Sequence, residues 1–184
     1  MTQVTSEGHQ VLVRFAGPGD CFGCIAALSG AVYTLSGQAV DDCLALAWDG
    51  ETVARLMESY PRLALNVLEL IAGYYKRLLD RYQELLTERV EQRVARALLR
   101  LARQAGQKVE GGVLIGLPLS REDLAQMTGT TLYTVSRILS RWEHEGFIEA
   151  GRERVLIHHP HAIVAIGEDL PPDTPPEDLQ PLAD

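Results

Sequence analysis

Residues 119–148 read LSREDLAQMTGTTLYTVSRILSRWEHEGFI, and this stretch decides the fold of the C-terminal half of the chain. Ser120 is a favourable N-cap residue, and Asp123 stands three positions later, where an acid can complete a capping box. Gly129 suits the conformation that ends a helix, and Thr130 or Thr131 can cap the next one. The spacing predicts two short helices joined by a tight turn, the unit that lays a recognition helix into the major groove of DNA.

The second of these helices is expected to be amphipathic. One side carries apolar residues at three- and four-residue spacing, namely Leu132, Val135, Ile138, Leu139 and Trp142. Arginine on the other side can pair with guanine edges, and hydroxyl groups can meet bases or phosphates. The residues of that polar side are Thr131, Tyr133, Thr134, Ser136, Arg137 and Arg141.

A β-hairpin is predicted after this helix, because the apolar runs 147–150 and 154–157 flank a turn that contains Gly151. A helix-turn-helix followed by a hairpin is a winged helix, in which Arg152 and Arg154 would meet the phosphate backbone. Many two-helix corners bind no nucleic acid. The small polar residues that open the second helix, its arginines and the basic turn together favour DNA binding here.

The charge distribution agrees with this division of the chain. The formal net charge is -8, yet residues 87–160 hold eleven Lys or Arg against nine Asp or Glu, a local net charge of +2. That value is small for phosphate binding, so affinity has to come from a few placed cations and from two copies acting on DNA together. No apolar run can span a membrane and no signal peptide opens the chain, which predicts a soluble cytoplasmic protein.

A long helix is predicted over residues 61–86, starting at Pro61. It is apolar on two sides, and a second copy of the same helix is the simplest partner for one of them. The stripe assigned to a dimer interface is Leu63, Val67, Leu70, Tyr74, Arg77, Arg81 and Leu85; a second stripe is Leu68, Ile71, Tyr75, Leu78, Leu79 and Tyr82. A helix buried within one chain is the alternative, and the homodimer is favoured because two-fold symmetry supplies a second half-site.

The remaining segments define the domain order. Strands are expected at 10–16 and 37–48, with a turn at 17–20 and a short helix from Asp49. A hinge is expected at residues 87–88, then a helix closed by Gly106, a strand at 113–115 and a short helix ending at Gly167. The predicted parts are a sensor domain (1–60), a dimerisation helix (61–86), a DNA-binding domain (87–167) and a disordered acidic, Pro-rich tail (168–184).

This order resembles the CRP/FNR family of bacterial transcription regulators from Glu7 to about His161. The local matches are GPGDCFG (17–23), ERVEQRVARALLRLA (88–102) and LSREDLAQMTGTTLYTVSRIL (119–139). The sequence of the segment 119–139 is similar to that of the subgroup that responds to nitrogen oxides and controls denitrification genes. The resemblance implies an α+β fold with a cyclic-nucleotide-binding-like β-roll, a long dimerisation helix and a C-terminal winged helix-turn-helix domain.

The resemblance also assigns roles to individual residues. It implies that Arg137 reads a guanine, whereas Leu132 and Tyr133 stand where the cyclic-AMP-type members carry Arg and Glu, so a different half-site preference is expected. Further positions match residues that touch phosphate, flanking bases or the wing. The complete predicted DNA-binding set is Ser120, Arg121, Thr130, Thr131, Tyr133, Thr134, Ser136, Arg137, Arg141, Gly151 and Arg152.

The sensor half departs from the family pattern. Gly23-Cys24 stands where cyclic-nucleotide-binding members have Gly-Glu, and Tyr33-Thr34 where they have an Arg that neutralises the cyclic phosphate. A buried phosphate without a cation is costly, so no cyclic nucleotide is expected to bind. Only about fifty residues precede the short helix, so the first strands of the roll are expected to be missing, either through a misplaced start, which is favoured, or through natural truncation.

Cysteine and histidine chemistry leaves alternatives open. Cys21 and Cys24 form a C-x-x-C pair that could act as a thiol switch or, with Cys43, ligate a metal or an iron–sulfur cluster. Simple packing of small thiols is favoured, because no fourth ligand is evident. His9 as a haem ligand in a gas sensor has no specific support, and His158, His159 and His161 are read as surface residues rather than metal ligands. No cofactor or metal is therefore expected.

The sequence predicts a non-enzymatic, homodimeric transcription regulator. Its expected partners are double-stranded DNA, a second copy of itself, RNA polymerase and an unidentified small-molecule or gas effector, with no membrane. Two other classes stay open: a thiol-based redox protein that uses Cys21 and Cys24, and a truncated interaction protein unable to bind DNA.

Overall fold

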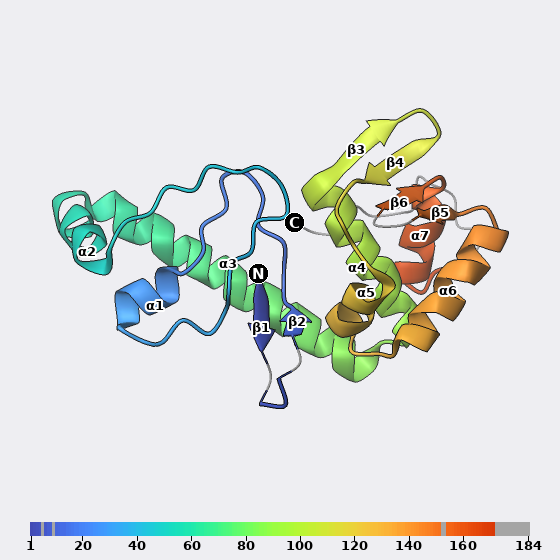
Figure 1. The fold of residues 1–184 in the computed structure, drawn as a ribbon, viewed down its shortest axis with the longest axis horizontal. Helices are drawn as coiled ribbons and strands as arrows, with labels where there is room; N and C mark the ends of the chain where they lie inside the picture. Colours follow the sequence, from blue (N-terminus) through green and yellow to red (C-terminus); the bar gives the residue numbers. More distant parts are fainter. Residues whose placement is uncertain (5, 9, 152–153, 172–184) are drawn as a thin grey trace. The chain divides into compact units, whose positions relative to one another are not determined.

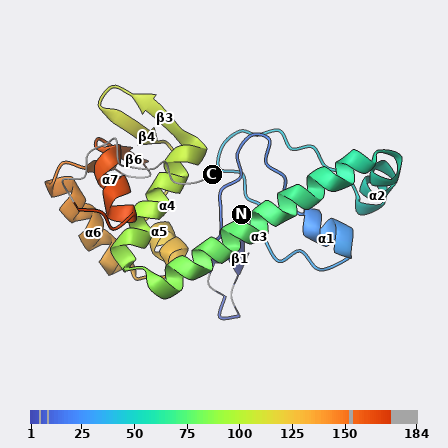
Figure 2. The ribbon, with the colours of Figure 1, turned by 180° about the vertical axis from the view of Figure 1, so that it is seen from behind.

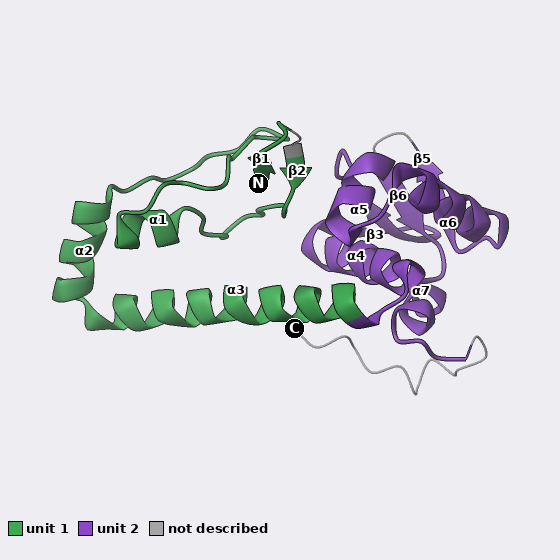
Figure 3. Cartoon of the chain, turned by 90° about the horizontal axis from the view of Figure 1, so that it is seen from below, with its two compact units in different colours: residues 1–86 green, residues 87–184 purple. Residues whose placement is uncertain are grey.

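The computed structural model describes residues 1–4, 6–8, 10–151 and 154–171 of the chain. The chain divides into two compact units, Met1–Leu86 and Thr87–Asp184, coloured separately in Figure 3. Within the described ranges, no helix combines the length and apolar character that crossing a membrane requires.

Unit 1 contains little regular sheet. Strands β1 (Thr2–Val4) and β2 (Gln10–Leu12) pair antiparallel, and helices α1 (Cys24–Ser29) and α2 (Gly50–Ser59) follow. The predicted helix after Asp49 is confirmed, since the Asp49 carboxylate caps α2 by accepting from the Thr52 backbone N–H at 2.7 Å.

The strand predicted at residues 37–48 is wrong. This segment is irregular, and its apolar side chains are largely exposed, with Leu44 at 91 % and Trp48 at 58 %. A strand needs a neighbouring strand to satisfy its backbone groups, and no described segment pairs along these residues. The prediction rested on the apolar run alone. Among the described residues, no strand pairs with this run, so it does not form a strand.

Helix α3 (Pro61–Thr87) has one side half-buried against the N-terminal segments of unit 1. The Tyr74 hydroxyl donates to the Cys21 carbonyl oxygen at 2.5 Å, and the Arg81 guanidinium donates to the Val13 carbonyl oxygen at 2.9 Å. The structure differs here from the predicted dimer stripe, because these two residues contact their own chain. The half-buried members of that stripe are Leu63, Val67, Leu70, Tyr74 and Arg81, whereas Arg77 and Leu85 are exposed.

The other apolar side of α3 is exposed in the single chain. We call it the α3 seam, and its large side chains are between 47 % and 67 % exposed. Its members alternate at four- and three-residue steps, the spacing of a coiled-coil stripe, and they are Leu68, Ala72, Tyr75, Leu79, Tyr82 and Leu86.

Unit 2 packs four helices with a four-stranded antiparallel sheet of order β3-β4-β6-β5. Figures 1 and 2 show the helices and the sheet of this unit from opposite sides. Its elements are α4 (Val90–Ala105), β3 (Gly106–Val109), β4 (Gly112–Ile115), α5 (Arg121–Thr128), α6 (Leu132–His144), β5 (Ile148–Gly151), β6 (Arg154–Ile157) and α7 (Pro160–Gly167). Helix α4 contacts α5, α7, β3 and β4. The predicted helices, the hairpin at 147–157 and the strand at 113–115 are confirmed, whereas β3 was not predicted.

The core of unit 2 is formed by side chains that are at most 2 % exposed. Apolar stripes of α4 and α6 supply most of it, so the helical periodicity read from the sequence corresponds to real burial. The largest members are Trp142, Leu98, Leu101, Ile115, Leu124, Leu139, Ile157, Ile163, Val94 and Val135.

Candidate nucleic-acid interface

Helix α5 begins with a complete capping box. The Asp123 backbone N–H donates to the Ser120 hydroxyl oxygen at 3.0 Å, and the Ser120 backbone N–H donates to the Asp123 carboxylate at 2.9 Å. The Ser120 hydroxyl also donates to that carboxylate at 2.6 Å. This reciprocal arrangement satisfies two backbone donors at the helix start and fixes its direction.

The turn between α5 and α6 is held from two directions. Gly129 adopts φ 62°, a conformation that costs glycine little, and so ends α5. Arg93 of α4 donates to the carbonyl oxygens of Thr128 at 2.9 Å and Gly129 at 3.4 Å. The local sequence pattern gave no sign of this role for Arg93, because the arginine lies 35 residues before the carbonyl that it binds.

Helix α6 begins at an N-cap formed by Thr131, whose hydroxyl oxygen accepts from the Thr134 backbone N–H at 3.2 Å. The two threonine hydroxyls also lie 3.0 Å apart, within hydrogen-bonding distance. One side of the helix is buried through Val135, Ile138, Leu139 and Trp142. The opposite side is therefore presented outward in a fixed rotation about the helix axis.

Arg137 stands in the middle of this outward side and is exposed. Among the described residues it makes no hydrogen bond or ion pair. Tyr133, one turn earlier, is 77 % exposed, and Ser136 is half-buried. Residues four apart on a helix share a face, so Tyr133 and Arg137 form one outward surface.

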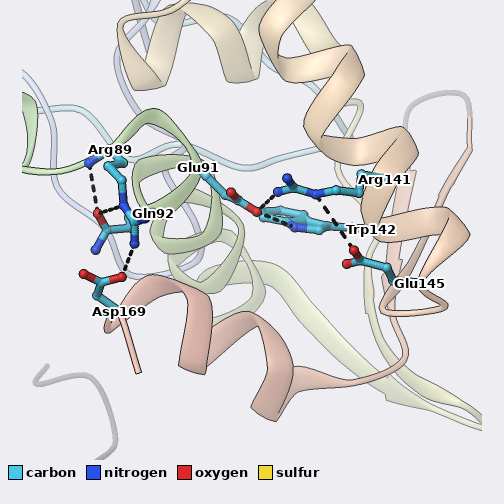
Figure 4. Close-up of polar contacts among 7 residues, drawn as sticks. All are labelled: Arg89, Glu91, Gln92, Arg141, Trp142, Glu145 and Asp169. Atoms are coloured by element: carbon cyan, nitrogen blue, oxygen red, sulfur yellow. Dashed lines mark hydrogen bonds and ion pairs between the residues drawn. The ribbon is translucent and has the colours of Figure 1, made fainter. Parts of the chain in front are cut away.

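Two other predicted DNA-contacting arginines are engaged within unit 2. The Arg141 guanidinium pairs with the Glu91 carboxylate of α4 and lies 4.0 Å from Glu145. Figure 4 shows Glu91 pointing toward Arg141 and Trp142, whose indole N–H donates to the same carboxylate at 3.1 Å. This contact joins α4 to α6.

Arg121 makes the second of these engagements, an ion pair with Glu143 at 3.6 Å. The other carboxylate oxygen of Glu143 accepts from the Ala150 backbone N–H at 3.1 Å. Glu143 therefore connects the start of α5, the helix α6 and the first strand of the wing. Arg121 contributes to the positioning of α6 through this contact.

The predicted wing is a hairpin of β5 and β6, with Gly151 opposite Arg154. Gly151 is exposed, and Arg154 lies 3.7 Å from the Glu149 carboxylate. Arg152, predicted to contact phosphate, lies outside the described residues, as do His9 and residues 172–184 of the predicted tail.

We expect Ser120→Ala to lower the free energy of unfolding of unit 2 by about 1 kcal/mol, because the hydroxyl caps α5. Asp123→Ala should cost a similar amount, and the double variant should cost less than the sum, since both residues belong to one capping box. Urea denaturation followed by circular dichroism measures these changes. Full additivity would contradict the reciprocal capping.

In unit 1, Cys21 and Cys43 are exposed, Cys24 is half-buried, and all three thiols are free. Burial raises the pKa of the Cys21 thiol, and the neighbouring Cys24 thiol adds to the rise. A raised pKa lowers the fraction of Cys21 that is in the reactive thiolate form. Across the described part of the chain, no three His, Cys, Asp or Glu side chains are grouped so that they could hold a metal ion.

The expectation that no cation lies near the turn at 17–23 is wrong. Arg14 reaches it from the segment after β2, donates to the Cys21 carbonyl oxygen at 2.8 Å and lies 3.6 Å from the Asp20 carboxylate. The Arg14 guanidinium carbon also lies 4.9 Å from the centre of the Tyr74 ring. The guanidinium carbon of Arg77 lies at the same distance from this ring centre. Burial raises the pKa of Tyr74, and the positive charge of Arg14 opposes that rise. Local sequence could not indicate the contact of Arg14 with Tyr74, because the two residues are sixty positions apart.

Comparison with known proteins gives matches to both units. A Crp-like helix-turn-helix domain model matches residues 92–166, and a cyclic nucleotide-binding domain model matches residues 1–60. The chain is 26 % identical over 151 residues to a CRP-like cAMP-activated global transcriptional regulator of Mycobacterium tuberculosis, covering 82 % of this chain and 67 % of that protein.

The chain is also 32 % identical over 145 residues to the cyclic AMP receptor protein of Thermus thermophilus, covering 78 % of this chain and 63 % of the relative. A solved structure of a CRP-family transcriptional regulator from Thermus thermophilus is similar with a TM-score of 0.75 at 25 % identity, over 92 % of this chain and 83 % of the other. The chain spans about two thirds of the length of the curated relatives it matches. Relatives named as the nitrogen fixation regulation protein FixK and the fumarate and nitrate reduction regulatory protein match as well. With its helix-turn-helix and hairpin, the chain therefore belongs to the CRP/FNR family of transcription regulators.

Proposed function

We propose that the protein is a homodimeric, sequence-specific DNA-binding transcription regulator without enzymatic activity. The observation that carries the proposal is Arg137, an exposed arginine without a partner among the described residues, on the outward side of α6. A free guanidinium there can pair with the O6 and N7 atoms of guanine through two hydrogen bonds. Helix α6 is held at a fixed rotation by its buried side and by the contacts of Arg93, Glu91 and Glu143.

The other predicted DNA contacts fall into two groups in this proposal. Exposed or half-buried polar groups around the turn and wing would meet phosphate, namely Ser120, Thr130, Thr131, Thr134 and Gly151. Arg152 is proposed for the same role from its place in the sequence alone. Arg121 and Arg141 are assigned mainly to holding α6 in place, because each is already paired with a carboxylate. Base recognition is thereby assigned to Arg137 and its neighbours on the outward side.

Selection of binding sites from a pool of random duplexes tests this function directly. We expect enrichment of an inverted repeat with half-sites about one helical turn apart, because two copies related by two-fold symmetry would read it. Failure to enrich any duplex at low salt, where phosphate contacts are strongest, would overturn the proposed function.

We assign the dimer contact to the α3 seam rather than to the stripe that faces the N-terminal segments. The large side chains of the seam are at least 47 % exposed in the single chain and follow coiled-coil spacing. Burial of such a stripe against its copy removes apolar area from water and brings two α6 helices to one duplex.

Leu79→Glu, in the middle of the seam, is expected to convert the dimer to monomers, because dimerisation would bury one unpaired carboxylate from each chain. Sedimentation velocity measures the change. Arg62→Glu, on the exposed polar side of the same helix, serves as the control and should leave the dimer intact. A Leu79→Glu protein that remains dimeric would place the interface elsewhere.

Unit 1 is proposed to sense a small molecule or gas other than a cyclic nucleotide, and RNA polymerase is the proposed partner at promoters. Arg14 is the cation beside the turn at 17–23, and it is already engaged by Asp20, the Cys21 carbonyl oxygen and the Tyr74 ring. Binding a cyclic phosphate would therefore require breaking these contacts or burying an unpaired anion.

Isothermal titration calorimetry with cyclic AMP and cyclic GMP tests this expectation, although relatives are named for cyclic AMP. We expect no heat of binding at ligand concentrations up to about 1 mM. Any Kd would then lie above about 1 mM, which corresponds to a free energy of binding weaker than about -4 kcal/mol. Micromolar binding of either nucleotide would contradict the proposal.

A further inference from the structure

The start of α6 exposes two adjacent apolar side chains, Leu132 at 50 % and Tyr133 at 77 %. Within the described residues of unit 2, the only other exposed large apolar side chain is Val109, which is less exposed, at 40 %. Every large apolar residue further along α6 is buried or nearly so. The exposed pair therefore stands at the end of α6 that a recognition helix directs at the bases, immediately after the N-cap Thr131.

This end of the helix holds no carboxylate, the charged acceptor for the cytosine N4 amino group, because the sequence has no Asp or Glu from residue 124 to residue 142. The hydroxyl groups there can meet several bases and so carry little preference. The next acid, Glu143, accepts from the Ala150 backbone N–H and pairs with Arg121. Apolar side chains in the major groove have one base group to contact, the 5-methyl group of thymine.

We propose that Leu132 and Tyr133 read the 5-methyl groups of thymines that lie beside the guanine paired with Arg137. The inference rests on the proposed DNA-binding function and specifies its sequence preference. Tyr133 shares the outward face with Arg137 one turn away. Leu132 is the first residue of α6 and is itself exposed, so all three side chains are available at the N-terminal half of the helix, the part that contacts base edges. The half-site is therefore a guanine flanked by T·A pairs, with no cytosine contacted by a carboxylate.

The test uses the full chain and the duplex enriched by selection, with single thymines of the half-site replaced by deoxyuridine, which lacks only the methyl group. We expect binding of the wild-type protein to weaken about fourfold for each contacted methyl, as measured by fluorescence anisotropy. Replacement of thymines outside the half-sites should leave the affinity unchanged.

Protein variants identify the residues that make the contact. Each of the variants Leu132→Ala and Tyr133→Ala should lose its sensitivity to one thymine of the half-site. For that variant, the duplex with this thymine and the duplex with deoxyuridine in its place should bind with equal affinity. Arg137→Ala should bind both more weakly and keep the difference between them. Because both apolar side chains are exposed, thermal melting of the two alanine variants should match the wild type.

The outcomes separate the inference from the function on which it rests. Failure to enrich a duplex overturns DNA binding and the inference with it. An enriched duplex that binds equally well with thymine or deoxyuridine overturns the inference alone and leaves DNA binding in place. Deoxyuridine sensitivity that survives in both alanine variants assigns the methyl contact to other residues and also overturns the inference.

Discussion

Replacing Trp142 with alanine is expected to lower the free energy of unfolding of unit 2 by about 3–5 kcal/mol, the usual cost of deleting a fully buried tryptophan side chain. Trp142 is 0 % exposed, and its indole N–H donates to the Glu91 carboxylate at 3.1 Å. The variant loses apolar packing in the core and a contact between α4 and α6. Urea denaturation followed by circular dichroism measures the loss.

The chain offers a matched control in its second tryptophan, Trp48, which is 58 % exposed. Trp48→Ala should change the free energy of unfolding by no more than about 0.5 kcal/mol. Trp142→Phe keeps much of the apolar volume, so its loss of unfolding free energy should lie between the losses for Trp48→Ala and Trp142→Ala. This variant reports on unit 2 even where Trp142→Ala fails to fold. Equal costs at positions 48 and 142 would contradict the core described for unit 2.

Arg137→Ala is expected to weaken binding of the selected duplex by about 1–3 kcal/mol, a factor of roughly 5 to 150, and to remove the preference for guanine at one half-site position. The guanidinium is exposed and unengaged among the described residues, so its removal leaves the fold intact. Arg137→Lys keeps the charge but loses the two parallel donors, and it should lose the guanine preference too. Anisotropy titrations with the guanine duplex and its base-substituted variants measure both effects.

Arg103→Ala is the matched control for this prediction. Arg103 is an exposed residue of the last turn of α4, and its replacement removes the same charge from unit 2. It should leave the base preference unchanged. Retention of the guanine preference by Arg137→Ala would show that another group reads this base.

The helix-turn-helix could be predicted from the sequence because its signals are local. The cap at Ser120, the left-handed Gly129, the cap at Thr131 and the apolar stripe of α6 each lie within the segment they organise. The irregular chain at 37–48 could not be predicted in this way. Whether an apolar run becomes a strand depends on a pairing strand elsewhere, and the run itself carries no information about that partner.

The candidate site was predictable in part for the same reason. Arg137 could be placed on the outward side of α6 from helical spacing alone. The engagement of Arg141 depends on Glu91, fifty residues earlier, and the support of the turn depends on Arg93. On α3 the sequence showed two apolar sides, but only the contacts of Tyr74 and Arg81 with the N-terminal segments indicated which side a second copy can use.

Two copies of this chain are proposed to read one duplex through paired α6 helices. The decisive measurement is the mass of the complex with the selected inverted repeat, obtained by light scattering after size exclusion. We predict two chains per duplex for the wild type, together with the loss of this complex in Leu79→Glu. One chain per duplex, or no complex at any protein concentration, would rule out recognition by two paired α6 helices.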